Sequence, residues 1–153
     1  IPDFTKMQER EIQDYVRSRI LASRTLSAAV QQPDVDANVV RTEHTIDDPA
    51  IIRRLAESFR VAAVKGRIPP IGPSYYIHFA CDDTFGARVI RKSVHLPLAN
   101  NQSGSVEVEV DWEFVETIAD LLDADKLVGI WQETSTDGDR NWDAGSGNGD
   151  ASN

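Results

Sequence analysis

The stretch YYIHFACDDTFGARVIRKSVHL, residues 75–96, decides the fold expected from this sequence. Side chains from Tyr75 to Cys81 alternate in the way that predicts a β-strand with one buried face. Residues 82–86 hold two aspartates and a glycine, as in a five-residue hairpin loop. The run over 87–96 is rich in β-branched residues and predicts a second strand, although its apolar residues also fit a helical period.

The histidines of this stretch were tested as metal ligands. A register that pairs Cys81 with Ala87 closes the hairpin and places His78 opposite Ile90. It separates His78 from His95 by about 17 Å along the hairpin, too far for the two rings to share one ion. The sequence holds no spaced set of metal ligands, so we expect no metal and no cofactor.

The residues after the hairpin predict one clear strand and one helix. In SVEVEV, residues 105–110, valines alternate with Glu107 and Glu109, which indicates a strand with one buried face. An aspartate N-cap follows and begins an amphipathic helix over 112–124. A last short strand is expected at 127–131.

The residues before the hairpin predict two amphipathic helices and one strand. Apolar residues recur at helical spacing over 3–24, and this helix is expected to continue to about residue 30. Residues 39–46 alternate as in a half-buried strand. A second helix begins at an Asp-Asp-Pro sequence and extends over 49–66, with a glycine at its C-terminal end. Three prolines and a glycine predict a loop at 67–74.

This order of elements predicts the α+β class. Because the strands are grouped along the chain, we expect a mainly antiparallel sheet of about four strands packed by two or three helices. Residues 1–132 are expected to form a single domain, since a chain of this length buries enough surface for one core. Residues 133–153 are rich in Gly, Ser, Asn and Asp, which predicts a flexible acidic tail.

Composition excludes several classes of protein. The chain has 16 Lys and Arg against 25 Asp and Glu, a formal net charge of −9. Binding to nucleic acid requires clustered basic residues, so no nucleic-acid partner is expected. No stretch reaches about 18 consecutive apolar residues, so no membrane-spanning segment is expected. Because the sequence begins at Ile1 without Met, we expect a processed chain or a fragment of a longer one. The compartment stays open, and an extracytoplasmic or organelle compartment is favoured.

The first functional hypothesis is a non-catalytic binding or assembly subunit. Such a subunit acts through protein–protein contacts with a protein partner or as a homo-oligomer, in an envelope-associated or multi-subunit complex. The candidate contact residues are Phe4, Tyr15 and Ile20 on the N-terminal helix. Glu107 and Glu109 form a second candidate contact surface, on the acidic strand face.

The alternative is a small enzyme whose site lies near the loop and strand of 67–82. Tyr76, His78 and Asp82 are its candidate catalytic residues. A pocket that contains a buried His78 with a shifted pKa would favour the enzyme. A flat surface with an exposed apolar helix stripe would favour the binding subunit.

Three segments resemble a known family. They are YVRSRILASRTLSAAVQQPDV (15–35), DDPAIIRRLAESFRV (47–61) and YIHFACDDTFGARVIRKSV (76–94). Together they resemble the first half of the periplasmic region of chain-length determinant proteins, the polysaccharide co-polymerases. This resemblance implies a helix over 84–94 and an oligomeric, non-catalytic component of the cell envelope. It assigns no functional residue.

Overall fold

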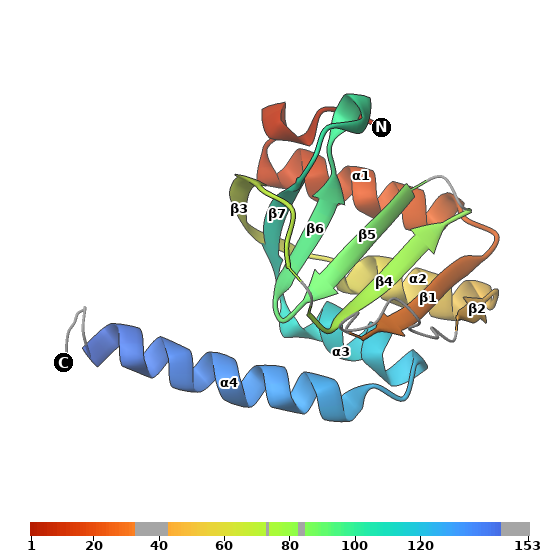
Figure 1. Ribbon diagram of the computed structural model, residues 1–153. Coiled ribbons are helices and arrows are strands. Elements are labelled where there is room, and N and C mark those ends of the chain that lie inside the picture. The colour runs from red at the N-terminus through yellow and green to blue at the C-terminus, as the bar shows by residue number, and fades with distance from the viewer. Residues whose placement is uncertain (33–42, 73, 83–84, 145–153) are drawn as a thin grey trace.

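The computed structural model describes most of the chain. It covers residues 1–32, 43–72, 74–82 and 85–144, with side chains at all of these except Asn101 and 135–144. The described residues form an antiparallel β-sheet with helices against one face (Figure 1). The α+β class expected from the sequence is confirmed.

Seven strands make up the sheet of the described residues, in the order β2-β1-β4-β5-β6-β7-β3, and each neighbouring pair is antiparallel. The strands are β1 (Leu26–Gln31), β2 (His44–Ile46), β3 (Val61–Ile68), β4 (Tyr76–Cys81), β5 (Phe85–Ile90), β6 (Ser93–Pro97) and β7 (Ser105–Val110). Strands β4 to β7 form a meander, with β1 on one side and β3 on the other. The expected number of about four strands was therefore wrong.

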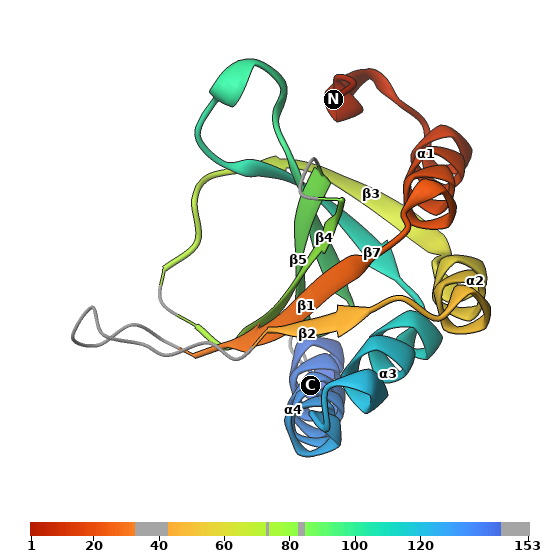
Figure 2. The ribbon, with the colours of Figure 1, turned by 90° about the vertical axis from the view of Figure 1, so that its right-hand side faces the viewer.

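Four α-helices and two short 3-10 helices accompany the sheet in the described part of the chain. They are η1 (Phe4–Lys6), α1 (Glu9–Ala22), α2 (Pro49–Ser58), η2 (Ala99–Asn101), α3 (Trp112–Leu121) and α4 (Asp125–Ala144). Figure 2 shows α1, α2 and α3 along one side of the sheet, with α4 beneath it. The opposite face of the sheet carries no α-helix from the described residues.

The core lies between the sheet and its helices. Val106 and Val108 of β7 are fully buried, because alternate residues of the strand point towards the helices. Phe114 of α3 lies at the centre, where its ring packs edge to face against Phe59 at 5.1 Å and Phe79 at 5.8 Å between ring centroids. This burial of aromatic and β-branched side chains joins the two layers.

Two of the strands were not predicted. Residues 26–31 were expected to continue the first helix, but α1 ends at Ala22 and β1 follows. The second helix, expected over 49–66, ends at Ser58, and residues 61–68 form β3. Both strands contain a pair of alanines, which favour strands weakly, so pairing with β4 and β7 decides their conformation.

The region after the hairpin loop forms two strands instead of one. The predicted strand over 87–96 is interrupted by a tight turn at Arg91 and Lys92, where Arg91 has a φ of 55°. The helix that the resemblance implied over 84–94 is therefore wrong in the described residues, which form β5 and β6.

The structure also bears on three expectations about short or terminal segments. Residues 127–131, expected as a strand, lie in α4. Residues 133–144, expected in a flexible tail, continue that helix, and 145–153 lie outside the described residues. Of the strand expected over 39–46, the part up to residue 42 also lies outside them, and the final three residues form β2.

Hydrogen bonds from α1 hold the C-terminal end of α2. Nε of Arg17 donates to the carbonyl oxygen of Phe59 at 2.8 Å, and its Nη2 donates to that of Glu57 at 3.2 Å. Oε1 of Gln13 accepts a hydrogen bond from the backbone N–H of Val61 at 3.0 Å. The two arginine bonds satisfy carbonyl groups at the end of α2, and the glutamine bond satisfies the first N–H of β3. In this way α1 fixes the point where α2 gives way to β3.

We expect Arg17→Ala to lower the free energy of unfolding by about 1–3 kcal/mol, because two carbonyl groups lose a charged donor. Urea denaturation measures the change. Arg10→Ala is the matched control, since the Arg10 side chain is 86% exposed and forms an ion pair with Asp14 of its own helix. The control is expected to cost less than about 0.5 kcal/mol. Equal losses in the two variants would contradict this role of Arg17.

Candidate functional site

A connection between β3 and β4 crosses the helix-free face of the sheet. We call its described part, residues 69–72, the strap. In Figure 1 the strap passes in front of β7 and β6, while α1 and α2 lie behind the sheet. Between the strap and the strands lies a cavity of about 420 Å³, which we call the strap pocket. Small-molecule sites typically measure about 300–1,000 Å³, so this cavity is large enough for a ligand.

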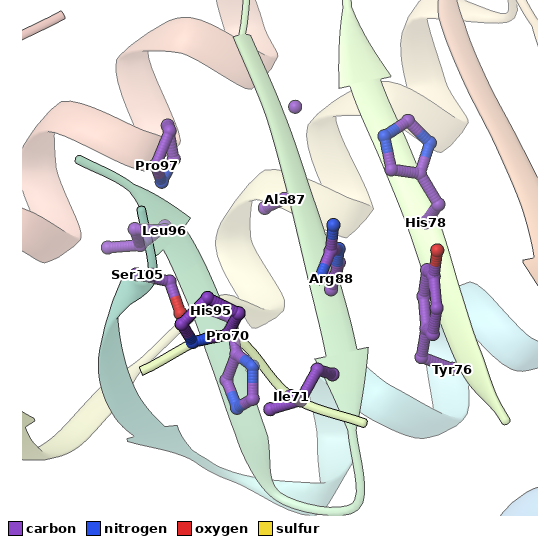
Figure 3. A pocket seen from close by; sticks show the side chains of 12 residues that line it. Pro70, Ile71, Tyr76, His78, Ala87, Arg88, His95, Leu96, Pro97 and Ser105 are labelled. Carbon is purple, nitrogen blue, oxygen red and sulfur yellow. The ribbon is translucent and has the colours of Figure 1, made fainter. Parts of the chain in front are cut away.

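The strap pocket has polar groups on strands and apolar walls around them. Its polar side chains are Tyr76, His78, Arg88, His95 and Ser105. Its apolar walls are Pro70 and Ile71 of the strap together with Pro97, and Ala87 and Leu96, whose side chains point to the helices, also border it. In Figure 3, His95 lies beside Pro70 and Ile71 of the strap, Arg88 follows on β5, and Tyr76 and His78 lie further across the sheet on β4. None of the described lining residues is an aspartate or a glutamate.

The strand register places four polar residues in one row across the sheet. His78 of β4 pairs with Arg88 of β5, and Arg88 pairs in turn with His95 of β6. His95 then pairs with Glu107 of β7. Directly paired residues of neighbouring strands point to the same face, so all four side chains leave the sheet on the side of the strap.

This register differs from the one expected. Cys81 pairs with Phe85, two residues earlier than predicted, and His78 consequently faces Arg88. The tight turn after β5 then brings His95 opposite Arg88 from the other side. Spacing along one long hairpin had separated the histidines by about 17 Å, whereas two strand spacings amount to about 10 Å. The prediction was wrong because it missed that turn.

Arg88 is the principal cation of the strap pocket. Its guanidinium carbon lies 5.2 Å from the centre of the Tyr76 ring, within the range of a cation–π contact. Arg88 forms no ion pair with any residue that the structure describes. The contact with Tyr76 holds the guanidinium while leaving its planar fork of N–H groups able to bind an acid group.

His95 is the buried polar residue of the pocket. Only 8% of its surface is exposed, and its Nδ1 has no hydrogen-bond partner among the described residues. Burial lowers the pKa of His95 below its ordinary value, the nearby Glu107 carboxylate partly raises it, and the Arg88 guanidinium lowers it. Buried polar atoms nearly always have a partner, so an unpaired nitrogen beside a pocket marks a contact point for a ligand.

The structure brings two of the three candidate catalytic residues to the pocket. Tyr76 and His78 line it, and the missing side chain of Gly86 leaves room for the imidazole, since a Cβ there would lie 3.2 Å from Nε2 of His78. Asp82 lies in the turn at the other end of β4, with an exposed side chain, and takes no part in the pocket.

Arg88 and His95 were not recognised as site residues from the sequence. Both alternate with buried apolar residues in β5 and β6, so their strands could have shown that they share the polar face. Alternation alone does not show which strands are neighbours. The row therefore became visible only with the pairing of β4, β5 and β6.

The candidate contact residues of the N-terminal helix lie inside the protein. Phe4 is 1% exposed and Ile20 is fully buried. Tyr15 packs edge to face against Phe4 and Phe85, with ring centroids 5.5 and 5.9 Å apart. The structure uses this apolar stripe for the chain's own core and leaves little of it for a partner.

The two glutamates of the acidic strand face are engaged within the sheet. Glu107 accepts a hydrogen bond from the hydroxyl of Ser93, with an oxygen–oxygen distance of 2.7 Å. Glu109 forms ion pairs with Lys65 at 3.5 Å and Lys92 at 3.8 Å. These bonds link β7 to β3 and β6, so both carboxylates have partners inside the chain.

Metal and thiol chemistry find little support in the structure. Within the described residues, no group of three or more His, Cys, Asp and Glu residues could hold a metal ion. Cys81 is 1% exposed. Burial raises the pKa of its thiol, which a hydrogen bond with Ser23 and the charge of Arg19 partly lower. The raised pKa keeps the thiol protonated and unreactive near neutral pH.

No family model, curated protein or solved structure matches this chain. The resemblance to chain-length determinant proteins stays a prediction. Separately, none of the helices in the described part of the chain is long and apolar enough to cross a membrane.

The strap depends on a glycine at the start of β7. Gly104 has a φ of 97°, and a Cβ at this position would clash with the carbonyl oxygen of Ile68, where the strap begins. We expect Gly104→Ala to lower the free energy of unfolding by at least about 1 kcal/mol. Gly129→Ala in α4 is the control, because its Cβ would meet no atom within 4 Å. Gly129→Ala should stabilise the protein by about 0.5–1 kcal/mol. Equal decreases of the melting temperature in the two variants would contradict the requirement for glycine at position 104.

The lowered pKa of His95 makes stability depend on pH. As the pH falls below the ordinary value of 6.5, the unfolded chain binds a proton that folded His95 resists, so unfolding becomes easier. We expect His95→Gln to lose less stability than the parent between pH 7.5 and pH 5, as measured by urea denaturation. His44→Gln, at an exposed position on β2, should retain the parent's pH dependence. If the free energy of unfolding changed with pH equally in the parent and in His95→Gln, His95 would make no contribution to the pH dependence of stability.

Proposed function

We propose that this chain is a binding protein that holds a small carboxylate-bearing molecule in the strap pocket. The composition of the pocket supports this proposal. Its described lining includes one arginine, two histidines and one tyrosine but no carboxylate, in a chain with 25 acidic and 16 basic residues. A cavity rich in hydrogen-bond donors favours an anion, because each donor stabilises negative charge. The neighbouring Glu107 carboxylate, outside the described lining, accepts the Ser93 hydroxyl.

The arrangement of the donors favours a carboxylate at the centre of the row. The Arg88 guanidinium can bind a carboxylate with two parallel hydrogen bonds, and its contact with the Tyr76 ring limits the directions it can take. His95 lies directly opposite on β6 and offers its unpaired Nδ1. The rest of the ligand would contact Ile71 and Pro97 on the apolar walls.

Binding without turnover is the form of function that these contacts favour. A general base is usually oriented by a hydrogen bond from a second group. Nδ1 of His95 has no such bond in the described residues, and Oε2 of Glu107, its neighbour on β7, accepts the Ser93 hydroxyl instead. This proposal shares the absence of catalysis with the function expected from the sequence, but a small molecule replaces the protein partner expected there.

A small enzyme at the same pocket is the second candidate. One observation favours it: His95 is buried beside the pocket, and its lowered pKa leaves the imidazole neutral near pH 7, as a general base must be. In that case the ligand would be converted rather than held.

Titrations with benzoate and benzamide test the binding proposal. We expect benzoate to shift the backbone N–H signals of β4, β5 and β6 in two-dimensional NMR spectra, and benzamide, its neutral counterpart, to shift them much less. Arg88→Gln should weaken benzoate binding about tenfold or more, since a hydrogen bond to a charged group contributes about 1.5–3 kcal/mol. Arg54→Gln is the control, because Arg54 is an exposed residue of α2 on the helix side.

The outcomes of these titrations separate the candidates. Equal shifts with benzoate and benzamide, or equal weakening by the two arginine variants, would contradict an anion site. One-dimensional spectra of candidate carboxylate ligands incubated with the protein monitor turnover. Conversion that disappears in His95→Gln would replace the binding proposal with the enzyme.

A further inference from the structure

A second cavity lies between α4 and the ends of β1, β4 and β5. Figure 1 shows α4 running below these strand ends. The cavity measures about 700 Å³, and we call it the helix cleft. It shares no described lining residue with the strap pocket, so the two sites can be occupied and tested separately.

The walls of the helix cleft are mainly apolar. They are formed by Val30, Tyr75 and Ile90 of the strand side and by Leu127, Ile130 and Trp131 of α4. Tyr75 is 47% exposed and Ile130 is 59% exposed, while Trp131 is buried to 5%. Two of the four exposed large apolar residues in the described chain therefore border one concave site, which favours an apolar ligand over chance exposure.

Cations outnumber carboxylates at the edge of the cleft. Arg91 and Lys126 both line it, and neither forms an ion pair within the described residues. Asp123 is the single carboxylate of the described lining. A buried hydroxyl, Oγ of Ser74, also belongs to the lining and has no hydrogen-bond partner there. These groups suit a ligand whose apolar body carries one acid group.

The hairpin turn between β5 and β6 positions Arg91. Arg91 has a φ of 55°, which a two-residue hairpin loop commonly requires at its first position. This turn sets Arg91 at the edge of the cleft.

We propose that the helix cleft binds a small amphipathic anion, an aromatic or aliphatic body with one acid group. The body packs against Ile90, Leu127 and Trp131, and the acid group lies near Arg91 and Lys126. This site is independent of the carboxylate site in the strap pocket.

Two naphthalene dyes provide the test. 1-Anilinonaphthalene-8-sulfonate combines the apolar body with an acid group, and N-phenyl-1-naphthylamine has nearly the same body without the acid. We expect the folded parent to bind one molecule of the sulfonate saturably, with enhanced fluorescence. The indole N–H signal of Trp131, assigned through single Trp→Phe variants, should shift on binding while that of Trp112 stays in place.

Three variants separate the two parts of the ligand. Ile130→Asp should weaken binding of both dyes about tenfold or more, because it places a carboxylate in the apolar wall. Arg91→Gln combined with Lys126→Gln should weaken the sulfonate about threefold to tenfold and change the neutral dye less than twofold. Leu21→Asp, at an apolar position of α1 that is also exposed, and Arg88→Gln in the strap pocket should leave both affinities unchanged.

Several results would overturn the proposal. Absence of saturable sulfonate binding would contradict the proposal. Equal weakening of dye binding by Leu21→Asp and Ile130→Asp would contradict it as well. Weakening by Arg88→Gln would place the dye in the strap pocket. Sedimentation at high protein concentration measures dimer formation. Dye binding that is lost as the dimer forms would assign the cleft to a second copy of the chain. Circular dichroism of every variant shows that each remains folded.

Discussion

Burial of one face of the β4–β7 meander sets the register on which the rest of the structure depends. Ile77, Phe79, Val94 and Val108 each point to the helices, and a shift of one residue in any of these strands would turn its apolar side chains to water. The same constraint sends the intervening residues to the other face. The core and the strap pocket are therefore two consequences of one pairing pattern.

The helix-free face of the sheet remains accessible because the described helices cover the opposite face. Helices α1 to α3 protect the apolar side, and the Arg17 bonds to the end of α2 join the first two of them. Among the described residues, the strap crosses the other side, and it passes close to Gly104, just before β7. A connection without regular structure leaves space above the strands, and that space holds the row of His78, Arg88 and His95.

Much of the local structure could be predicted, and the candidate site only in part. The alternation in residues 105–110 and the helix start at 112 were both confirmed, because each depends on side chains close in sequence. Tyr76 and His78, named as candidates from the sequence, line the strap pocket together with Pro70 and Ile71. Arg88 and His95 were missed because a turn of two residues, Arg91 and Lys92, reverses the chain within a run that looks continuous.

Taken alone, the sequence determined the α+β class, the strands with strict alternation and the beginning of α2, where the Asp48 side chain accepts a hydrogen bond from the N–H of Ala50 at 2.9 Å. These features depend on periodicity and capping, which act over a few residues. Only the tertiary structure decided that the alanine-rich segments 26–31 and 61–68 become strands, since their partners are distant in sequence. The two cavities likewise exist only where the strap and α4 meet the sheet, because residues from separate strands line each of them.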